Sequence, residues 1–244
     1  MTLQASFGAM QGFGNMTHHP FSPSVLARRK LCPGSYYSEI DLPEIETEEA
    51  QEGIKAHKIM AKQGLSSPIL EAEADGAEWN LRVQIDKALD FRKHLIKEAS
   101  QVFTEEHLEL HFNDQLLTSD IADLVAIFSD GHVKVVDWQF GRSPLPQIAA
   151  NMQLMTYAAM IFQRWREIQS VEAIIYQPRF STTYKTVYLR DKLLDILNAV
   201  LHIIDTAKTL PLSLAPSVEA CAYCKAVTIC PAAEAKARLE RKNC

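Results

Sequence analysis

The spacing of apolar and polar positions predicts a helical first half, followed by strands that alternate with helices. Helical periodicity runs through 48–62, after Thr47, and through 78–103, which contains neither Gly nor Pro. The expected elements are a short helix from Pro23 to the Cys32-Pro33-Gly34 turn with Ser24 as its candidate cap, helices over 48–62, 78–103, 144–166 and 191–208, and strands over 107–112, 121–128, 133–140, 171–176 and 186–189.

This order of elements favours an α/β or mixed α+β fold, in which one central mixed sheet is flanked by helices. We divide the chain into a poorly ordered lead-in over 1–22, a core over 23–210 and a cysteine-bearing module over 211–244. The core is where we expect the chemistry, because the acidic strands described below lie in it.

Composition places few limits on function. The chain has 244 residues, 47% of them apolar, which is enough for a core of ordinary globular size. It has no run of 18 apolar residues, and its start has neither a basic region nor a continuous apolar stretch, so we expect no membrane span or secretory signal and a cytoplasmic location. A net charge of -5 argues against general attraction to nucleic acid, but it allows a local basic patch.

The segment 121–140 is predicted to form a hairpin that brings two acids together. If Ser129, Asp130 and Gly131 form a three-residue loop with Gly in the left-handed position, residues whose numbers sum to 260 face each other. Asp123 and Asp137 then face each other across the ladder, with Cβ atoms about 4.5–5.5 Å apart.

Both strands of this hairpin are apolar on both faces, so we expect the hairpin to be central and covered. An acid pair that lacks a counter-charge would be costly in such a place. A divalent cation removes that cost, and oxygen ligands with room for water favour Mg²⁺ or Mn²⁺ over a closed zinc site.

Four short motifs, in this order along the chain, resemble those of the PD-(D/E)XK nuclease superfamily, and in particular its RecB-type members. The motifs are Glu52-Gly53-x-x-x-His57, Ile121-Ala-Asp123, Val135-Val-Asp137-Trp-Gln139-Phe-Gly-Arg142 and Gln153-x-x-x-Tyr157. The likeness is to phage-encoded relatives of the CRISPR adaptation nucleases and of the AddB nuclease domain, and it implies a restriction-endonuclease-like sheet.

The resemblance also implies roles for individual residues. His57, Asp123, Asp137 and the Trp138 carbonyl would bind the ion, and Glu52 and Gln139 would belong to the catalytic group. Gln153 and Tyr157 lie one helical turn apart and would position the substrate or support the hairpin, although such a pair is also ordinary on an amphipathic helix. Taken alone, His57 would be interpreted as a surface histidine, and the two acids make it a candidate metal ligand.

Position 139 departs from the family pattern, in which a lysine usually stands two residues after the second acid. Gln139 can hydrogen-bond a water molecule but carries no positive charge. Three explanations stay open: an active natural variant, a relative that lost catalysis and kept binding, or a substitution made to trap substrate.

Three cysteines near the C-terminus and one near the N-terminus indicate metal ligation. Cys221-x2-Cys224-x5-Cys230, together with Cys32, gives four thiolates, enough for a 4Fe-4S cluster or a structural Zn²⁺. The resemblance favours the iron-sulphur cluster, which would join the N- and C-terminal parts. Cys244 is left over, and the odd total disfavours a disulfide framework.

Two functions of different classes follow. The first is a metal-dependent DNA nuclease, an exonuclease of phage recombination or DNA processing that acts on single- or double-stranded DNA with free ends in a bacterial or phage-infected cytoplasm. The second is a DNA-binding protein of the same fold with weakened or lost catalysis, as Gln139 would allow. Arg28 and Arg29 are candidate DNA contacts, although such a basic run is more often a solvated face. A homo-oligomer or a recombination partner protein is compatible with either function.

Overall fold

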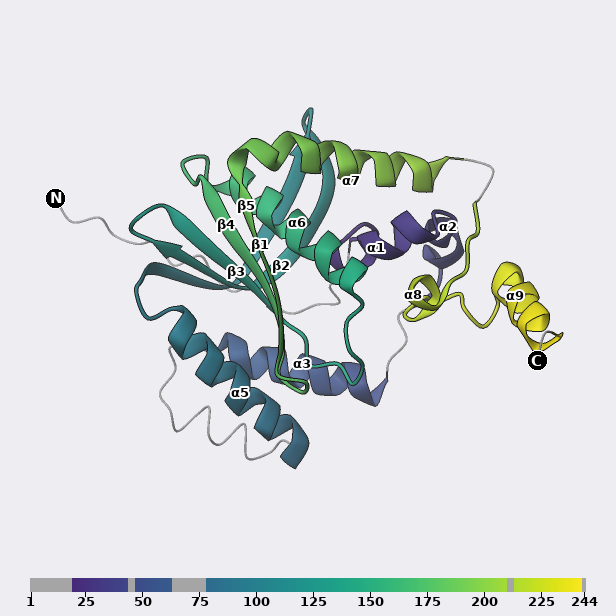
Figure 1. The fold of residues 1–244 in the computed structure, drawn as a ribbon, viewed down its shortest axis with the longest axis horizontal. Coiled ribbons are helices and arrows are strands. Elements are labelled where there is room, and N and C mark those ends of the chain that lie inside the picture. The colour runs from purple at the N-terminus through teal and green to yellow at the C-terminus, as the bar shows by residue number, and fades with distance from the viewer. Residues whose placement is uncertain (1–18, 44–46, 63–77, 210–212, 243–244) are drawn as a thin grey trace.

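The computed structural model describes residues 19–43, 47–62, 78–209 and 213–242, which form one mixed sheet with helices on both faces (Figure 1). The strands are β1 (Ala99–Phe112), β2 (Gln115–Phe128), β3 (His132–Trp138), β4 (Ser170–Gln177) and β5 (Thr182–Leu189). The helices are α1 (Pro23–Leu31), α2 (Ser35–Glu39), α3 (Glu48–Ala61), α5 (Trp79–Leu95), α6 (Gln147–Arg164), η1 (Arg190–Lys192), α7 (Leu193–Lys208), α8 (Val218–Cys221) and α9 (Pro231–Lys242).

The sheet has the order β1-β2-β3-β4-β5. Only β3 and β4 pair in parallel, and α6 makes the crossover connection between them that a parallel pair requires. The other neighbouring strands are antiparallel. The predicted class, a mixed α/β fold with one central sheet between helices, is therefore confirmed.

The predicted register of the β2–β3 hairpin is confirmed. Leu124 faces Val136 and Ile127 faces Val133, and the numbers of each pair sum to 260 as expected. Gly131 has a φ of 80°, the left-handed conformation that the loop was expected to require. β2 and β3 also lie in the interior of the sheet, so the hairpin is central.

Two apolar cores lie on opposite faces of the sheet. On one face, α6, α7 and α1 pack over side chains such as Val125 and Val135. On the other face, α3 and α5 pack over side chains such as Leu124 and Val136. The alternation of side chains along β2 and β3 supplies both faces, which explains why these strands are apolar throughout.

The helix predicted over 78–103 is shorter than expected. α5 ends at Leu95, and the residues from Ala99 to Phe103 belong to β1, where Phe103 faces Val125 of β2. The absence of Gly and Pro allowed a continuous helix, but pairing with β2 outweighs local helical preference here. Ser24 lies inside α1 and Ser22 holds the N-cap position, whereas the Thr47 side chain caps α3 by accepting a hydrogen bond from the Ala50 amide.

Most of the predicted lead-in, residues 1–18, lies outside the described residues. The last part of it is ordered: Phe21 is buried and stacks on Tyr36 with ring centroids 4.8 Å apart. The core therefore extends at least to Phe21.

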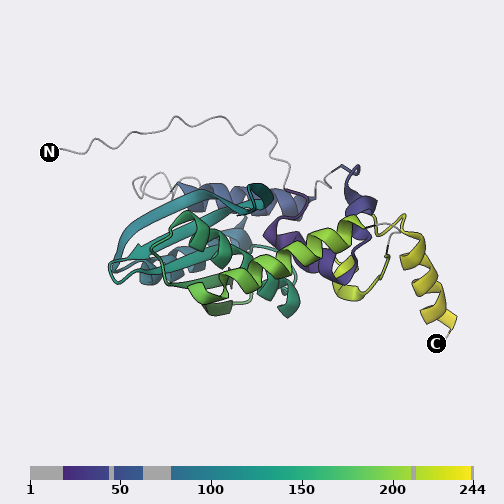
Figure 2. The ribbon, with the colours of Figure 1, turned by 90° about the horizontal axis from the view of Figure 1, so that it is seen from above.

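The C-terminal segment returns to the N-terminal helices, so α8 lies beside α1 (Figure 1). The Gly34 amide donates to the Ser213 carbonyl at 2.8 Å, and the Lys225 amide donates to Glu39 Oε1 at 2.8 Å. The expected boundary at 210/211 falls on residues outside the described part. Figure 2 shows α9 standing away from the sheet at the far end of this segment.

Candidate functional site

Asp123 and Asp137 lie at the point where the ladder between β2 and β3 stops. The last pair of this ladder is Leu124 with Val136, and the two aspartates are the next residues on each strand. Both are buried, with 8% and 7% of their surface exposed. Two carboxylates held this close in a buried place repel each other unless positive charge or protons compensate them.

Asp123 has a protein partner for each carboxylate oxygen. His57 Nδ1 lies 2.8 Å from Oδ1, and the backbone N–H of Trp138 donates to Oδ2 at 2.7 Å. The Trp138 amide thus ties β3 to the acid of β2 just beyond the end of their ladder.

Asp137 is held by two neutral donors. Gln139 Nε2 donates to its Oδ2 at 2.5 Å, and the Tyr157 hydroxyl lies 3.3 Å from its Oδ1. The same hydroxyl lies 3.1 Å from Asp120 Oδ2, so it bridges two acids. Burial, and then the charge of Asp123, raise the pKa of Asp137 well above its usual range. This carboxylate therefore lacks adequate positive compensation.

His57 reaches this acid pair from α3, on the far face of the sheet from α6. Its ring stands edge-on to that of Phe140, with centroids 5.4 Å apart. Burial alone would lower the pKa of His57, but Asp123, with further help from Asp137 and Glu105, raises it to about 9. The protonated imidazole therefore supplies positive charge to the acid pair near neutral pH.

Glu105 is a further acid of the site that the sequence did not reveal. Thr104 faces Leu124 and Glu106 faces Ala122, which places Glu105 beside Asp123 on the side away from Asp137. Its φ of 52° is unusual for a residue other than Gly. Burial, and then the charge of Asp123, raise the pKa of Glu105 to about 7, against the opposite effect of His57.

These side chains provide ligands of the right type for a divalent cation, but they are not gathered into a compact shell. Among the described residues, the one group of three His, Cys, Asp or Glu ligand atoms within 4.8 Å of one another is Glu48, Glu52 and Glu78. A cation between Asp123 and Asp137 would have to replace protein hydrogen bonds, in particular the one that Gln139 makes.

Glu52, expected in the catalytic group, lies apart from the two aspartates in the hydrogen-bond network. Its Oε1 accepts a hydrogen bond from Arg142 Nη2 at 2.8 Å. Gln153, on α6 one turn before Tyr157, is 2% exposed, and its side chain makes no hydrogen bond within the described part of the chain.

Arg28 and Arg29, the candidate DNA contacts, are both engaged inside the protein. Arg28 donates to the Tyr223 carbonyl and lies 3.2 Å from Glu39. Arg29 is 5% exposed and bonds Glu39 and, at 2.9 Å, Ser35. In this arrangement they hold α2 and the C-terminal segment against α1.

The four cysteines proposed as ligands lie toward one end of the molecule, where the C-terminal segment returns to α1 and α2. Cys32 is buried, and its sulphur accepts a hydrogen bond from the Ala215 amide at 3.3 Å. Cys221, Cys224 and Cys230 are half-buried. In the described structure, no three of these sulphurs lie within 4.8 Å of one another.

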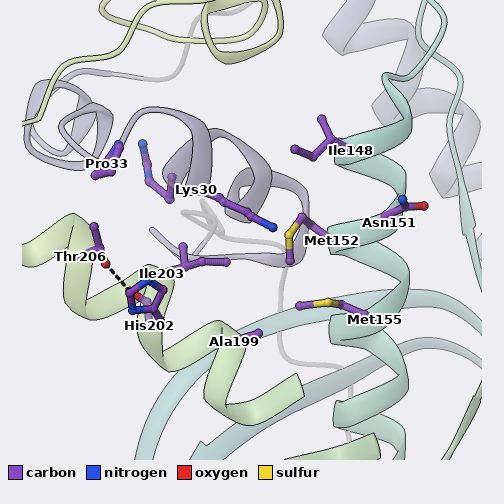
Figure 3. A pocket seen from close by; sticks show the side chains of 11 residues that line it. Lys30, Pro33, Ile148, Asn151, Met152, Met155, Ala199, His202, Ile203 and Thr206 are labelled. Atoms are coloured by element: carbon purple, nitrogen blue, oxygen red, sulfur yellow. Dashed lines mark hydrogen bonds between the residues drawn. The ribbon is translucent and has the colours of Figure 1, made fainter. Parts of the chain in front are cut away.

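A cavity of about 540 Å³ opens elsewhere, between α1, α6 and α7 (Figure 3). Its wall includes Met152, Met155 and Ile203, with Lys30 and His202 among its polar members. No carboxylate is among the described residues that line it.

Fold and site together define a mixed α/β protein whose central sheet holds a buried pair of aspartates beside a histidine from a helix. The chain belongs to the family DUF2800, described as a protein of unknown function, whose model matches residues 18–243. A search of curated proteins finds no match. None of the described helices combines the length and the apolar composition needed to cross a membrane.

Two solved structures share part of the arrangement. A protein of Eubacterium rectale, whose name proposes an exonuclease, is 9% identical with a TM-score of 0.48, and the match covers 88% of each chain. A protein named SSO0001 is 18% identical with a TM-score of 0.40, and the match covers 82% of this chain and 94% of the other. Likeness at this level assigns no activity to the present chain.

Proposed function

We propose that this protein is a metal-dependent deoxyribonuclease, an exonuclease that acts in phage recombination or DNA processing. The observation that carries the proposal is the pair Asp123 and Asp137, buried side by side on central strands with His57 bonded to the first of them. The order of the four motifs, which resembles that of RecB-type nucleases, supports the same conclusion.

Asp123, Asp137, His57 and the Trp138 carbonyl would hold the ion. A bound Mg²⁺ or Mn²⁺ would lower the pKa of a coordinated water and neutralise charge on the scissile phosphate. Hydrolysis breaks one P–O bond of the DNA backbone and adds the elements of water across it. Asp137, whose hydrogen-bond partners Gln139 and Tyr157 are neutral, fits such an ion, because the two carboxylates repel each other without it.

The protein side chains have separate tasks in this proposal. The Trp138 amide fixes one oxygen of Asp123, so this carboxylate keeps its orientation. Tyr157 supports Asp137 from α6. The Gln139 side-chain N–H, which donates to Asp137 in the structure, can instead donate to an attacking water or to a phosphate oxygen. Glutamine brings no positive charge to either.

The second candidate, a DNA-binding protein without catalysis, is favoured by that same Gln139. In the structure the Gln139 side-chain amide donates a hydrogen bond to Asp137, and the family pattern has a lysine at position 139. A protein in this state would keep a DNA-binding surface while hydrolysis is slow or absent.

One set of assays separates the two. The wild-type protein and the Gln139→Lys, Asp123→Asn and Asp137→Asn variants are incubated with end-labelled linear DNA and Mn²⁺, and Asp114→Asn, an exposed turn residue, is the control. We expect hydrolysis by wild type and Asp114→Asn and none by the other two Asn variants. Hydrolysis only after Gln139→Lys would indicate a disabled or substrate-trapping form, and hydrolysis by neither wild type nor Gln139→Lys would favour the binding protein. Hydrolysis that survives both Asp changes would remove the site from the proposal.

We also propose that Cys32, Cys221, Cys224 and Cys230 hold a 4Fe-4S cluster, with structural Zn²⁺ as the alternative. The support is the return of the C-terminal segment to Cys32, through the Ala215 amide and the contacts of Gly34 with Ser213. Ligation of a single Zn²⁺ would require the sulphurs to move closer together, because no three of them lie within 4.8 Å of one another. The cluster would then organise the end of the molecule that carries α1 and α8.

A further inference from the structure

The chain that leaves β3 organises the candidate site through consecutive residues. The Trp138 amide holds Asp123, and the Gln139 side chain holds Asp137. The next residue, Phe140, is 5% exposed and packs its ring against His57. Each contact acts directly on one member of the site.

Arg142, two residues further on, makes the next contact, and it reaches α3. Its Nη2 donates to Glu52 Oε1 at 2.8 Å and lies 3.8 Å from Glu48 Oε2. Its backbone N–H also donates to Glu49 Oε1. One residue thus holds three acids of the first two turns of α3, through both its side chain and its backbone.

α3 needs such an attachment at this end. The side chains that bury α3 against the sheet are Ala56, Ile59 and Met60, all in its second half. From Glu48 to Lys55 none of its side chains is buried. The contacts with Arg142 tie the first half of α3 to the loop after β3, and His57 follows Ala56, about one turn beyond Glu52.

An ordinary surface ion pair does not explain this arrangement. Arg142 is 47% exposed and Glu52 is 18% exposed, and half-exposed pairs usually contribute little to global stability. A two-point attachment that includes a backbone amide instead fixes the orientation of one element against another. Glu48 and Glu52 also approach Glu78 of the segment leading into α5, so without a cation these acids would repel one another.

We propose that Arg142 is a positioning residue: by clamping the first half of α3 to the loop that follows β3, it sets the place of His57 relative to Asp123 and Asp137. This inference rests on the proposed function for its catalytic meaning, but the clamp itself is a property of the folded chain. In the proposed site His57 would contact the acid pair and also bind the metal ion. Small displacements of a metal ligand weaken metal binding strongly.

The test compares Arg142→Gln, Arg142→Lys and the control Lys185→Gln, which breaks a different exposed ion pair, that of Lys185 with Glu172. The first readout is the pair of His57 ring signals in NMR spectra of metal-free protein. We expect these signals to shift in Arg142→Gln, to return toward their wild-type positions in Arg142→Lys, and to stay unchanged in the control. Unchanged His57 signals in Arg142→Gln would overturn the proposal.

The second readout is Mn²⁺ affinity, measured by electron paramagnetic resonance. Arg142→Gln should weaken it about tenfold, the lower range for groups that orient a metal ligand, and Arg142→Lys should recover most of the loss. If wild type binds no Mn²⁺, the proposed function fails, while the His57 signals still decide whether Arg142 positions the histidine.

Glu52→Gln provides an independent variant if Arg142→Gln does not fold. It should shift the His57 signals in the same direction, and the double variant should add little to either single change, since both remove one interaction. Fully additive shifts would contradict a shared clamp.

Discussion

His57 Nδ1 lies 2.8 Å from Asp123 Oδ1, and this contact joins a helix on one face of the sheet to a central strand 66 residues further along the chain. The pKa of His57 is raised from 6.5 to about 9, and that of Glu105 from 4.5 to about 7. Both groups therefore bind their protons more tightly in the folded protein than in the unfolded chain.

This difference predicts how stability depends on pH in metal-free protein. The contribution of each group is complete below its unfolded pKa and is lost as the pH rises through its folded pKa, near 7 for Glu105 and near 9 for His57. We expect the melting temperature in EDTA to fall as the pH is raised over this range. His57→Gln should flatten the upper part of the profile, and His202→Gln, at an exposed position of α7, is the histidine control.

Tyr157→Phe should destabilise the protein and alter the acid pair. The hydroxyl is buried and serves both Asp120 and Asp137, so its loss leaves two carboxylates short of a donor. We expect a loss of about 1–2 kcal/mol in the free energy of unfolding, measured by urea denaturation at neutral pH. The loss should grow as the pH rises through the raised pKa of Asp137, because its charged carboxylate needs the hydroxyl as donor more than the protonated form does.

Tyr184→Phe is the matched control for this measurement. It removes a hydroxyl that donates to the Leu145 carbonyl at 2.8 Å, an acceptor that does not titrate. Its effect should therefore be independent of pH. Equal pH dependence in the two variants would contradict a role of Tyr157 in holding the acids.

The hairpin could be predicted because its determinants are local. Gly131 supplies the left-handed turn position, and the alternation along the two strands fixes which residues face each other as far as Leu124 and Val136. Asp123 and Asp137 are the next residues, just beyond this ladder. The prediction that His57 binds the metal ion rests on the family resemblance, because nothing in the surrounding helix distinguishes a metal ligand from a surface histidine.

The parts that the sequence did not reveal depend on long-range pairing. The sequence does not reveal Glu105 because β1 begins before the predicted strand, and the pattern places the first residues of β1 in the preceding helix. Arg142 and Glu52 are 90 residues apart, and only the packing of α3 beside the β3 exit brings them together. Arg29 looked like a solvated or DNA-binding residue, but Glu39 draws it into the interior.

Gly34→Ala should weaken the attachment of the C-terminal segment. A Cβ at this position would lie 2.9 Å from Leu214 Cδ2 and 3.0 Å from the Ser213 carbonyl oxygen. Because the backbone carbonyl cannot move aside cheaply, we expect a loss of about 1–3 kcal/mol, measured by urea denaturation.

Gly53→Ala is the opposite case and serves as the control. A Cβ there would meet nothing within 4 Å, and the residue lies inside α3. We expect a gain of up to about 1 kcal/mol, as for Gly replaced by Ala in an open helix position. A Gly34→Ala variant as stable as wild type would show that the segment from 213 onward is not held at Gly34.

The four cysteines proposed as ligands lie toward one end of the molecule, and their role can be tested through bound iron. Protein purified under mild conditions should be brown, with broad visible absorbance and about four iron atoms per chain by elemental analysis. Cys32→Ser should abolish the colour, because Cys32 is the one ligand that comes from the N-terminal side. Cys244→Ser should leave iron content unchanged, since that residue is not in the proposed set. A colourless protein with stoichiometric zinc would replace the iron-sulphur cluster by a structural zinc site, and a metal-free protein that folds fully would leave the cysteines without either role.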